Sequence, residues 1–107
     1  MAVYIIAQIT IEDRKTYNKY DDGFFAVWQK YEGEVLSVDE VPTVLEGDWT
    51  ATRSVLLKFP SREAAMAWAT SPEYQEIAKH RLAGGVTHSI MVEGFDGAIV
   101  GKPDLDT

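Results

Sequence analysis

Cysteine is absent from this sequence of 107 residues, and its absence removes three kinds of chemistry. The chain has no disulfide bond, no thiolate metal site and no cysteine nucleophile. Such a chain fits a reducing compartment, so we expect a cytoplasmic protein. No apolar run approaches the roughly 20 residues of a membrane-spanning helix, and residues 1–10 lack the basic segment and cleavage site of a signal peptide. We therefore expect no membrane partner.

Positive charge is also scarce. Lys and Arg number 10 against 17 Asp and Glu, which gives a formal net charge of −7 at pH 7. Nucleic acids and anionic membranes bind to clustered cations. The sequence has only scattered pairs, such as Arg14 with Lys15 and His80 with Arg81. We therefore expect no nucleic-acid partner.

Recognisable catalytic and metal-binding motifs are missing as well. The sequence has neither the Gly-x-Ser-x-Gly turn of hydrolases nor a phosphate-binding loop. His80 and His88 are its only histidines, and no third ligand stands at a recognised metal-binding spacing. We expect no metal and no cofactor.

What the chain does contain is the composition of one globular domain. Hydrophobic residues make up 46% and charged residues 25% of the sequence, which is ordinary for a folded protein. The length leaves room for one domain only. We assign residues 1–95 to it and expect residues 96–107, with two glycines and a proline, to form a loosely ordered tail.

Both halves of the sequence follow the order strand, helix, strand. Alternating and β-branched segments predict strands at residues 3–11, 34–38, 53–59 and 87–93. The segments between these strands are predicted helices, and Asp13, Ser61 and Ser71 are suited to cap their N-termini. This order predicts an α+β fold, ferredoxin-like βαββαβ, with a four-stranded antiparallel sheet.

The first predicted helix carries an aromatic stripe. Aromatic residues recur at steps of three and four at Tyr17, Tyr20, Phe24, Trp28 and Tyr31. Such a stripe is usually part of the core. Buried tyrosine hydroxyls need partners, however, so the stripe would alternatively line a cavity for a flat, hydrophobic ligand, closed by Trp68 and Tyr74 from the second half of the chain.

The predicted sheet has one face covered by helices and one open face. From the alternation we assign to the helix side Val3, Ile5, Ala7, Ile9, Val55, Leu57, Phe59, His88, Ile90 and Val92. The open face then keeps Tyr4, Ile6, Leu56 and Met91. Exposed apolar patches mark interaction sites, so we predict a homodimer whose sheets pack face to face. A monomer with a partly apolar open face is the alternative.

A set of motifs in fixed order resembles a bacterial protein family. The motifs are YIIA at residues 4–7, Tyr17-x-x-Tyr20, VLEGDW at 44–49, FPS at 59–61 followed by Ala64, Ala65 and Trp68, SPEY at 71–74 and VEG at 92–94. They resemble domain-of-unknown-function family 1330, in the dimeric α+β barrel superfamily, over residues 2–94. The sequence departs from that family at Lys58, where an acid is usual.

The resemblance implies a homodimer with a ligand pocket between the helices and the sheet. Distant relatives include cofactor-free monooxygenases, small-molecule isomerases and stress-response proteins. The family itself is named for having no assigned function, so the resemblance implies a fold that serves enzymes and non-enzymes alike.

Four residues are candidates for the rim of such a pocket. His88 is the only ionisable group in the inward set of the last strand and would act as a base, or else would lie half exposed at the strand end and bond to a carbonyl. Glu46 and Arg53 flank a loop and would pair across its neck. That pair would hold Trp49 over a cleft, or would only fasten the loop while Trp49 packs on the dimer partner.

Three hypotheses about function follow. The first is a homodimeric protein that binds a small hydrophobic ligand through Glu46, Trp49, Trp28, Trp68 and Tyr17, with His88 and Arg53 beside them. The second is a cofactor-independent monooxygenase or isomerase acting on a flat hydrophobic substrate, with His88 as base and Arg53 stabilising an oxyanion. The third is a dimeric scaffold with no ligand.

Overall fold

The computed structural model describes residues 1–95, 97 and 101 of the chain. Its elements are β1 (Val3–Ile11), α1 (Arg14–Trp28), β2 (Glu34–Asp39), β3 (Arg53–Phe59), α2 (Arg62–Ala69), α3 (Pro72–Gly84) and β4 (Gly85–Glu93). The four strands form one antiparallel sheet in the order β2-β3-β1-β4. The predicted ferredoxin-like fold is confirmed. Most of the expected tail, residues 96, 98–100 and 102–107, lies outside the described residues.

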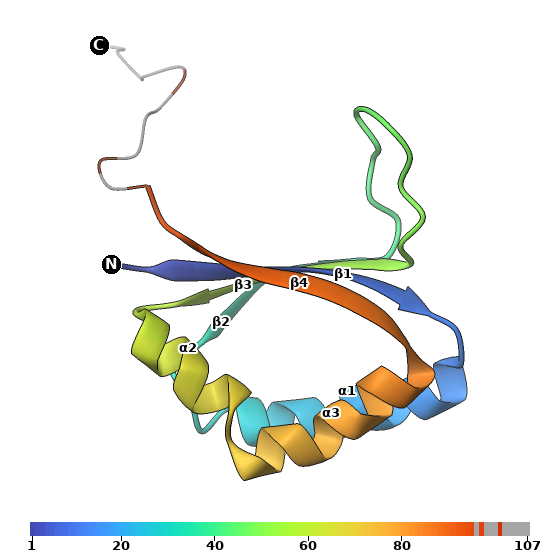
Figure 1. The fold of residues 1–107 in the computed structure, drawn as a ribbon, viewed down its shortest axis with the longest axis horizontal. Helices are drawn as coiled ribbons and strands as arrows, with labels where there is room; N and C mark the ends of the chain where they lie inside the picture. Colours follow the sequence, from blue (N-terminus) through green and yellow to red (C-terminus); the bar gives the residue numbers. More distant parts are fainter. Residues whose placement is uncertain (96, 98–100, 102–107) are drawn as a thin grey trace.

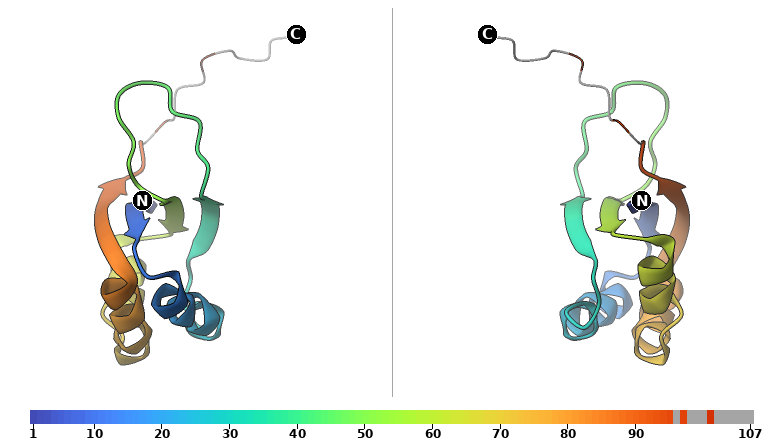
Figure 2. Two further views of the ribbon diagram at one scale, coloured as in Figure 1. Left: turned by 90° about the vertical axis from the view of Figure 1, so that its right-hand side faces the viewer. Right: turned by 90° about the vertical axis from the view of Figure 1, so that its left-hand side faces the viewer.

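The helices all lie on one face of the sheet, as Figures 1 and 2 show. The long connection between β2 and β3, residues 40–52, projects on the opposite side and is called the arm here. Thr52 fixes the base of the arm to β1, because its N–H donates to the Ile9 carbonyl at 2.8 Å and its Oγ1 accepts from the Ile11 N–H at 3.1 Å. No helix in the described part of the chain is long and apolar enough to cross a membrane.

Three side-chain caps begin the helices where the sequence predicts them. Asp13 Oδ1 accepts from the Thr16 N–H at 3.1 Å, and Ser61 Oγ accepts from the Ala64 N–H at the same distance. Ser71 Oγ accepts from the N–H at Tyr74 at 3.2 Å. Each cap satisfies a backbone donor that the first helical turn leaves free, so the three predicted helix starts are confirmed.

An aromatic cluster joins the helix layer to the sheet at one end. Phe59 of β3 is fully buried, and its ring centroid lies 5.4 Å from that of Trp28 and 5.5 Å from that of Trp68. Trp28 and Trp68 meet edge to face at 5.1 Å. Aromatic pairs in this geometry add to the stability that their buried area already provides, so this cluster fixes α1 and α2 on the sheet.

The facing of β4 is opposite to the one that the alternation predicts. Residues paired across antiparallel strands share a face. The pairs that face the helices are Ile5–Met91, Ala7–Ser89 and Ile9–Thr87. The residues of β4 that face away are His88, Ile90 and Val92. The prediction failed because it assigned the more apolar set to the helix side, whereas the helix-facing positions of β4 line a cavity, where small polar side chains leave room.

This reversal makes the open face of the sheet more apolar. Its cross-strand neighbours include Tyr4 with Val92 and Ile6 with Ile90. Ile6 is 39% and Ile90 58% exposed. The open apolar face that the sequence predicts is therefore present, with Ile90 and Val92 in place of Met91.

Gly84 and Gly85 carry the chain directly from α3 into β4. The carbonyl of Gly84 accepts from the N–H groups of Glu12 and Asp13, at 2.8 and 2.9 Å. A Cβ on Gly84 would lie 2.7 Å from the backbone N of Tyr17, and one on Gly85 would collide with the Thr10 carbonyl. Only glycine allows the start of α1 to approach this closely.

Gly84→Ala should lower the free energy of unfolding by about 2 kcal/mol, the usual cost of forcing an extra methyl into a packed site. Urea unfolding followed by circular dichroism measures the change. Gly101→Ala is the control, because a Cβ there meets no atom within 4 Å. Equal stability of Gly84→Ala and Gly101→Ala would show that the approach at Gly84 can relax.

Candidate functional site

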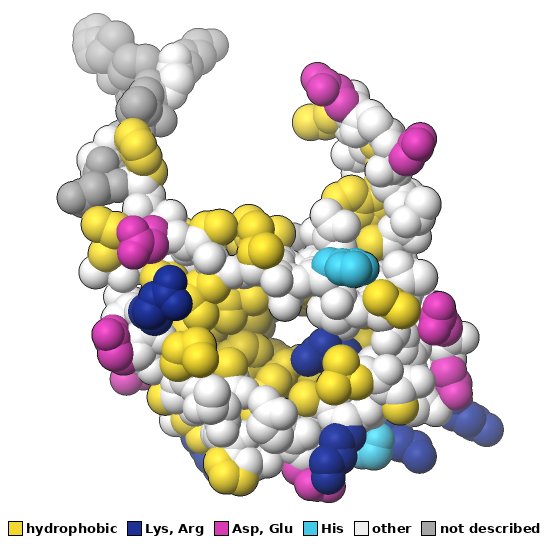
Figure 3. Space-filling view, viewed as in Figure 1, with side chains coloured by type: hydrophobic (Ala, Val, Ile, Leu, Met, Phe, Trp, Pro, Cys, Tyr) yellow, Lys and Arg dark blue, Asp and Glu magenta, His cyan; other side chains and the backbone are white. Residues whose placement is uncertain are grey.

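A cavity of about 680 Å³ lies between the helices and the sheet. The helices line it with the aromatic rings of Tyr17, Tyr20, Phe24, Trp28, Trp68 and Tyr74. The sheet lines it with aliphatic side chains, including Ile5, Ala7, Val55 and Leu57. Figure 3 shows the hollow beneath the sheet with hydrophobic side chains inside it. Its volume and lining are those of small-molecule sites.

The helix side of the cavity is held in shape by contacts between aromatic side chains. The hydroxyls of Tyr20 and Tyr74 lie 2.9 Å apart in a buried hydrogen bond that links α1 to α3. Phe24 stacks on Trp28 at 5.1 Å with 25° between the ring planes. The predicted aromatic stripe on α1 thus forms a wall of a cavity as well as part of the core.

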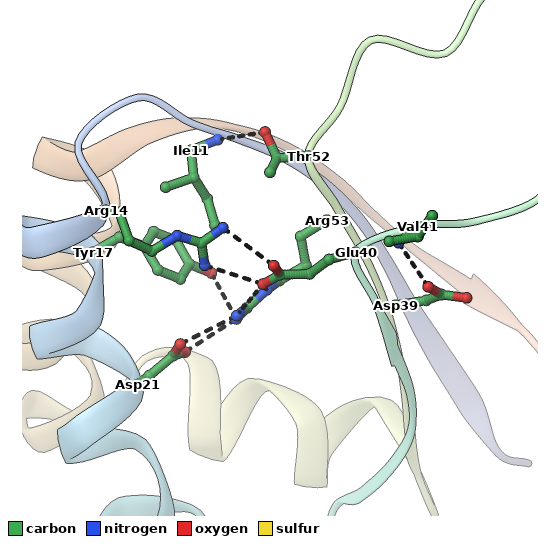
Figure 4. Close-up of polar contacts among 9 residues, drawn as sticks. All are labelled: Ile11, Arg14, Tyr17, Asp21, Asp39, Glu40, Val41, Thr52 and Arg53. Carbon is green, nitrogen blue, oxygen red and sulfur yellow. Dashed lines mark hydrogen bonds and ion pairs between the residues drawn. The ribbon is translucent and has the colours of Figure 1, made fainter.

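Arg53 closes one end of the cavity with a network of ion pairs (Figure 4). Its guanidinium donates to both carboxylate oxygens of Asp21 at 3.0 and 3.1 Å, and to Glu40 Oε2 at 2.9 and 2.6 Å. It also donates to the Tyr17 hydroxyl at 3.4 Å. Arg14 binds the same Glu40 carboxylate through both oxygens at 3.1 Å. One side chain of β3 therefore connects the end of β2 to α1.

The network fixes the charges of its members. Burial opposes the charge on Arg53, but its hydrogen bonds to Asp21 and Glu40 outweigh burial and raise its pKa. Hydrogen bonds from Arg14 and then Arg53 lower the pKa of Glu40. Both groups are therefore ionised at neutral pH.

Two phenols that line the cavity stay protonated. Burial raises the pKa of Tyr17 and, more strongly, that of Tyr20. The Tyr17 hydroxyl accepts from Arg53, and the side chain is fully buried.

Two buried polar atoms in residues that line the cavity have no hydrogen-bond partner among the described residues. They are Trp68 Nε1 and Thr87 Oγ1. Both atoms are enclosed by the surrounding protein and present almost no surface to the cavity.

Four of the predicted site residues come together in this cavity. Trp28, Trp68, Tyr17 and Arg53 all line it. The aromatic wall that the sequence predicts from two helices is therefore present, with Arg53 beside it.

Three other predicted site residues do not line the cavity. Glu46 lies on the exposed arm, and Arg53 pairs with Glu40 instead, since Glu40 directly follows the end of β2 while Glu46 lies further out on the arm. Trp49 is 37% exposed on the arm. His88 lies on the open face of the sheet, in a shallow hollow with Ile6 and Gln8.

Four residues of the cavity lining and the Arg53 network are not among the site residues predicted from the sequence: Asp21, Glu40, Arg81 and Thr87. Asp21 stands four residues after Tyr17, so helical spacing alone places both on one face. The position of Arg81 near the end of its helix was attributed to the helix dipole. Thr87 was assigned to the open face, because the predicted facing of β4 was reversed. Within residues 1–95, 97 and 101, no three His, Cys, Asp or Glu side chains gather as a metal site.

Comparison with known sequences gives one family. The family model described as "Domain of unknown function (DUF1330)" matches residues 2–95. No curated protein matches the sequence.

Comparison with solved structures gives relatives in fold. RPA0582, a protein of unknown function from Rhodopseudomonas palustris, is 17% identical with a TM-score of 0.75, over 89% of this chain and 83% of its own. A dimeric ferredoxin-like protein of unknown function from Jannaschia sp. CCS1 is 12% identical with a TM-score of 0.66, over 88% and 100%. SnoaB, a cofactor-independent oxygenase from Streptomyces nogalater, is 10% identical with a TM-score of 0.65, over 89% and 94%.

Glu40→Gln should lower the free energy of unfolding at pH 7 by about 1 kcal/mol, because a partly exposed ion pair contributes little more. The folded state lowers the pKa of Glu40. Its contribution is therefore complete above the ordinary glutamate pKa of about 4.3 and disappears as the pH falls through the lowered value. Urea unfolding of wild type and Glu40→Gln at a series of pH values from 7 downward measures the difference in free energy of unfolding, which should shrink as the pH falls.

Glu46→Gln is the matched control and should leave stability unchanged within about 0.5 kcal/mol. An equal loss from Glu46→Gln and Glu40→Gln would contradict the pairing of Arg53 described above.

Proposed function

The chain belongs to the DUF1330 family, which has no assigned activity, and we propose that it acts as a homodimeric small-molecule-binding protein. The observation that carries this proposal is the cavity of about 680 Å³ between helices and sheet. Small-molecule sites are concave, mostly apolar and of about this size. This cavity is partly open to solvent and has aromatic walls, so it suits a bound organic molecule.

The same cavity weighs against a scaffold with no ligand. A protein whose only task is to dimerise would be more stable with its helices packed directly on the sheet, because burial of apolar surface stabilises the folded state. The aromatic side chains are held in shape by one another and by the pair between Tyr20 and Tyr74. This arrangement suits a preformed site.

A cofactor-independent oxygenase or isomerase is the second candidate. The fold shared with SnoaB supports it by analogy alone. Its proposed base, His88, does not line the cavity. Asp21 is the carboxylate that does, and both of its oxygens are bound by Arg53. Binding is therefore the better-supported function.

The open face of the sheet supports the homodimer. Contiguous exposed apolar side chains on a soluble protein mark an interaction surface, and Ile6, Ile90 and Val92 lie together there with Tyr4. The Jannaschia protein, which has the same fold, is dimeric. Packing two such faces together would remove both from water.

Ser89→Phe should weaken binding of the neutral fluorescent probe N-phenyl-1-naphthylamine at least fivefold, because the ring enters the cavity from β4. A fluorescence titration measures the dissociation constant. His88→Phe is the matched control: it is adjacent in the strand but faces away from the helices, so it should bind as wild type does. A wild-type protein that takes up no probe, and carries no extra mass in native mass spectrometry, would overturn the proposed binding function.

Ile6→Asp should convert the protein to a monomer, because it places a charge in the centre of the proposed interface. Sedimentation velocity should give wild type a mass twice the 12.0 kDa of one chain. Leu82→Asp, at a site 63% exposed on α3, should remain a dimer. Equal masses for wild type and Ile6→Asp would exclude this interface.

A further inference from the structure

We infer that the cavity takes a planar aromatic carboxylate, with its ring against the aromatic wall and its carboxylate at Arg81. This inference rests on the proposed function and adds to it the charge and shape of the ligand.

The charges that line the cavity point to an anion. Three charged side chains line it, Arg53, Arg81 and Asp21. Arg53 already binds the carboxylates of Asp21 and Glu40. Arg81 has no ion pair among the described residues and lies over the ring of Tyr20, with Cζ 5.6 Å from the ring centroid. In a protein with a net charge of −7, the cavity therefore presents a cation whose charge no neighbour balances.

The walls select a flat ring. Phe24 and Trp28 lie nearly parallel, and Tyr20 and Trp68 flank them with ring centroids 5.7 and 6.4 Å from that of Phe24. The facing sheet residues, such as Val55 and Leu57, are aliphatic. A slot with one aromatic and one aliphatic side buries both faces of a planar molecule.

The experiment compares 2-naphthoate with 2-naphthamide, which has nearly the same shape without the charge. Isothermal titration calorimetry at low salt should show wild type binding 2-naphthoate at least tenfold more tightly than the amide, a typical ratio for a charge-assisted hydrogen bond. Arg81→Gln should abolish this preference, because it removes the charge that distinguishes the acid from the amide. Arg81→Lys, which keeps the charge, should retain most of the preference.

One further variant is the control. Lys79→Gln removes the same charge from α3 at an exposed site, where Lys79 pairs with Glu76, and should change nothing.

The outcomes separate the two proposals. Equal affinity for acid and amide, or a preference that survives Arg81→Gln, would overturn the inference about charge and leave the binding function standing. Failure of wild type to bind either naphthyl compound would count against both. If Arg81→Gln loses both ligands through misfolding, Arg81→Lys decides, because a loss of preference with the charge retained would also overturn the inference.

Discussion

Phe59, Trp28 and Trp68 form the junction through which the helix layer rests on the sheet. Trp28 and Trp68 belong to different helices and pack on the same fully buried ring. At the other end, the Gly84 carbonyl binds the two N–H groups that precede α1. The layers are thus supported at both ends of the strands, and the cavity lies between the supports. The cavity exists because the aromatic cluster at one end and the Gly84 hydrogen bonds at the other keep the helix layer from packing directly on the sheet.

The polar residues of the site divide into a structural and an open group. Arg53 is satisfied by two carboxylates, and its charge joins β2, β3 and α1. Such an ion pair needs both partners in good geometry to repay the cost of removing them from water. Arg81 lines the same cavity and has no ion pair among the described residues. This contrast distinguishes a cation that joins elements of the fold from one that makes no ion pair.

The fold could be predicted from the sequence because each local signal agrees with the global one. Asp13, Ser61 and Ser71 cap helices, and the alternation in residues 53–59 fits a strand with one buried side. The site was predicted less well. The helical aromatic wall followed from a spacing within one element, but His88 was assigned to the wrong side of β4. Hydrophobicity identifies the buried side of a strand only when that side meets a packed core and the other meets water. The first condition fails for β4, because its helix-facing side meets a cavity. Glu40 was missed in favour of Glu46 because sequence distance does not indicate the path of a long loop.

The order of the strands also constrains how the protein is made. β1 leaves the ribosome first, yet it lies between β3 and β4, and β4 ends at Glu93. The edge of β1 that pairs with β4 therefore stays unpaired until nearly the whole domain has been synthesised. Closing such distant contacts is slow, and an apolar strand with free edges is prone to associate with other chains in the meantime. A strand that is paired along both edges in the folded sheet is thus the one whose second edge stays open for most of synthesis.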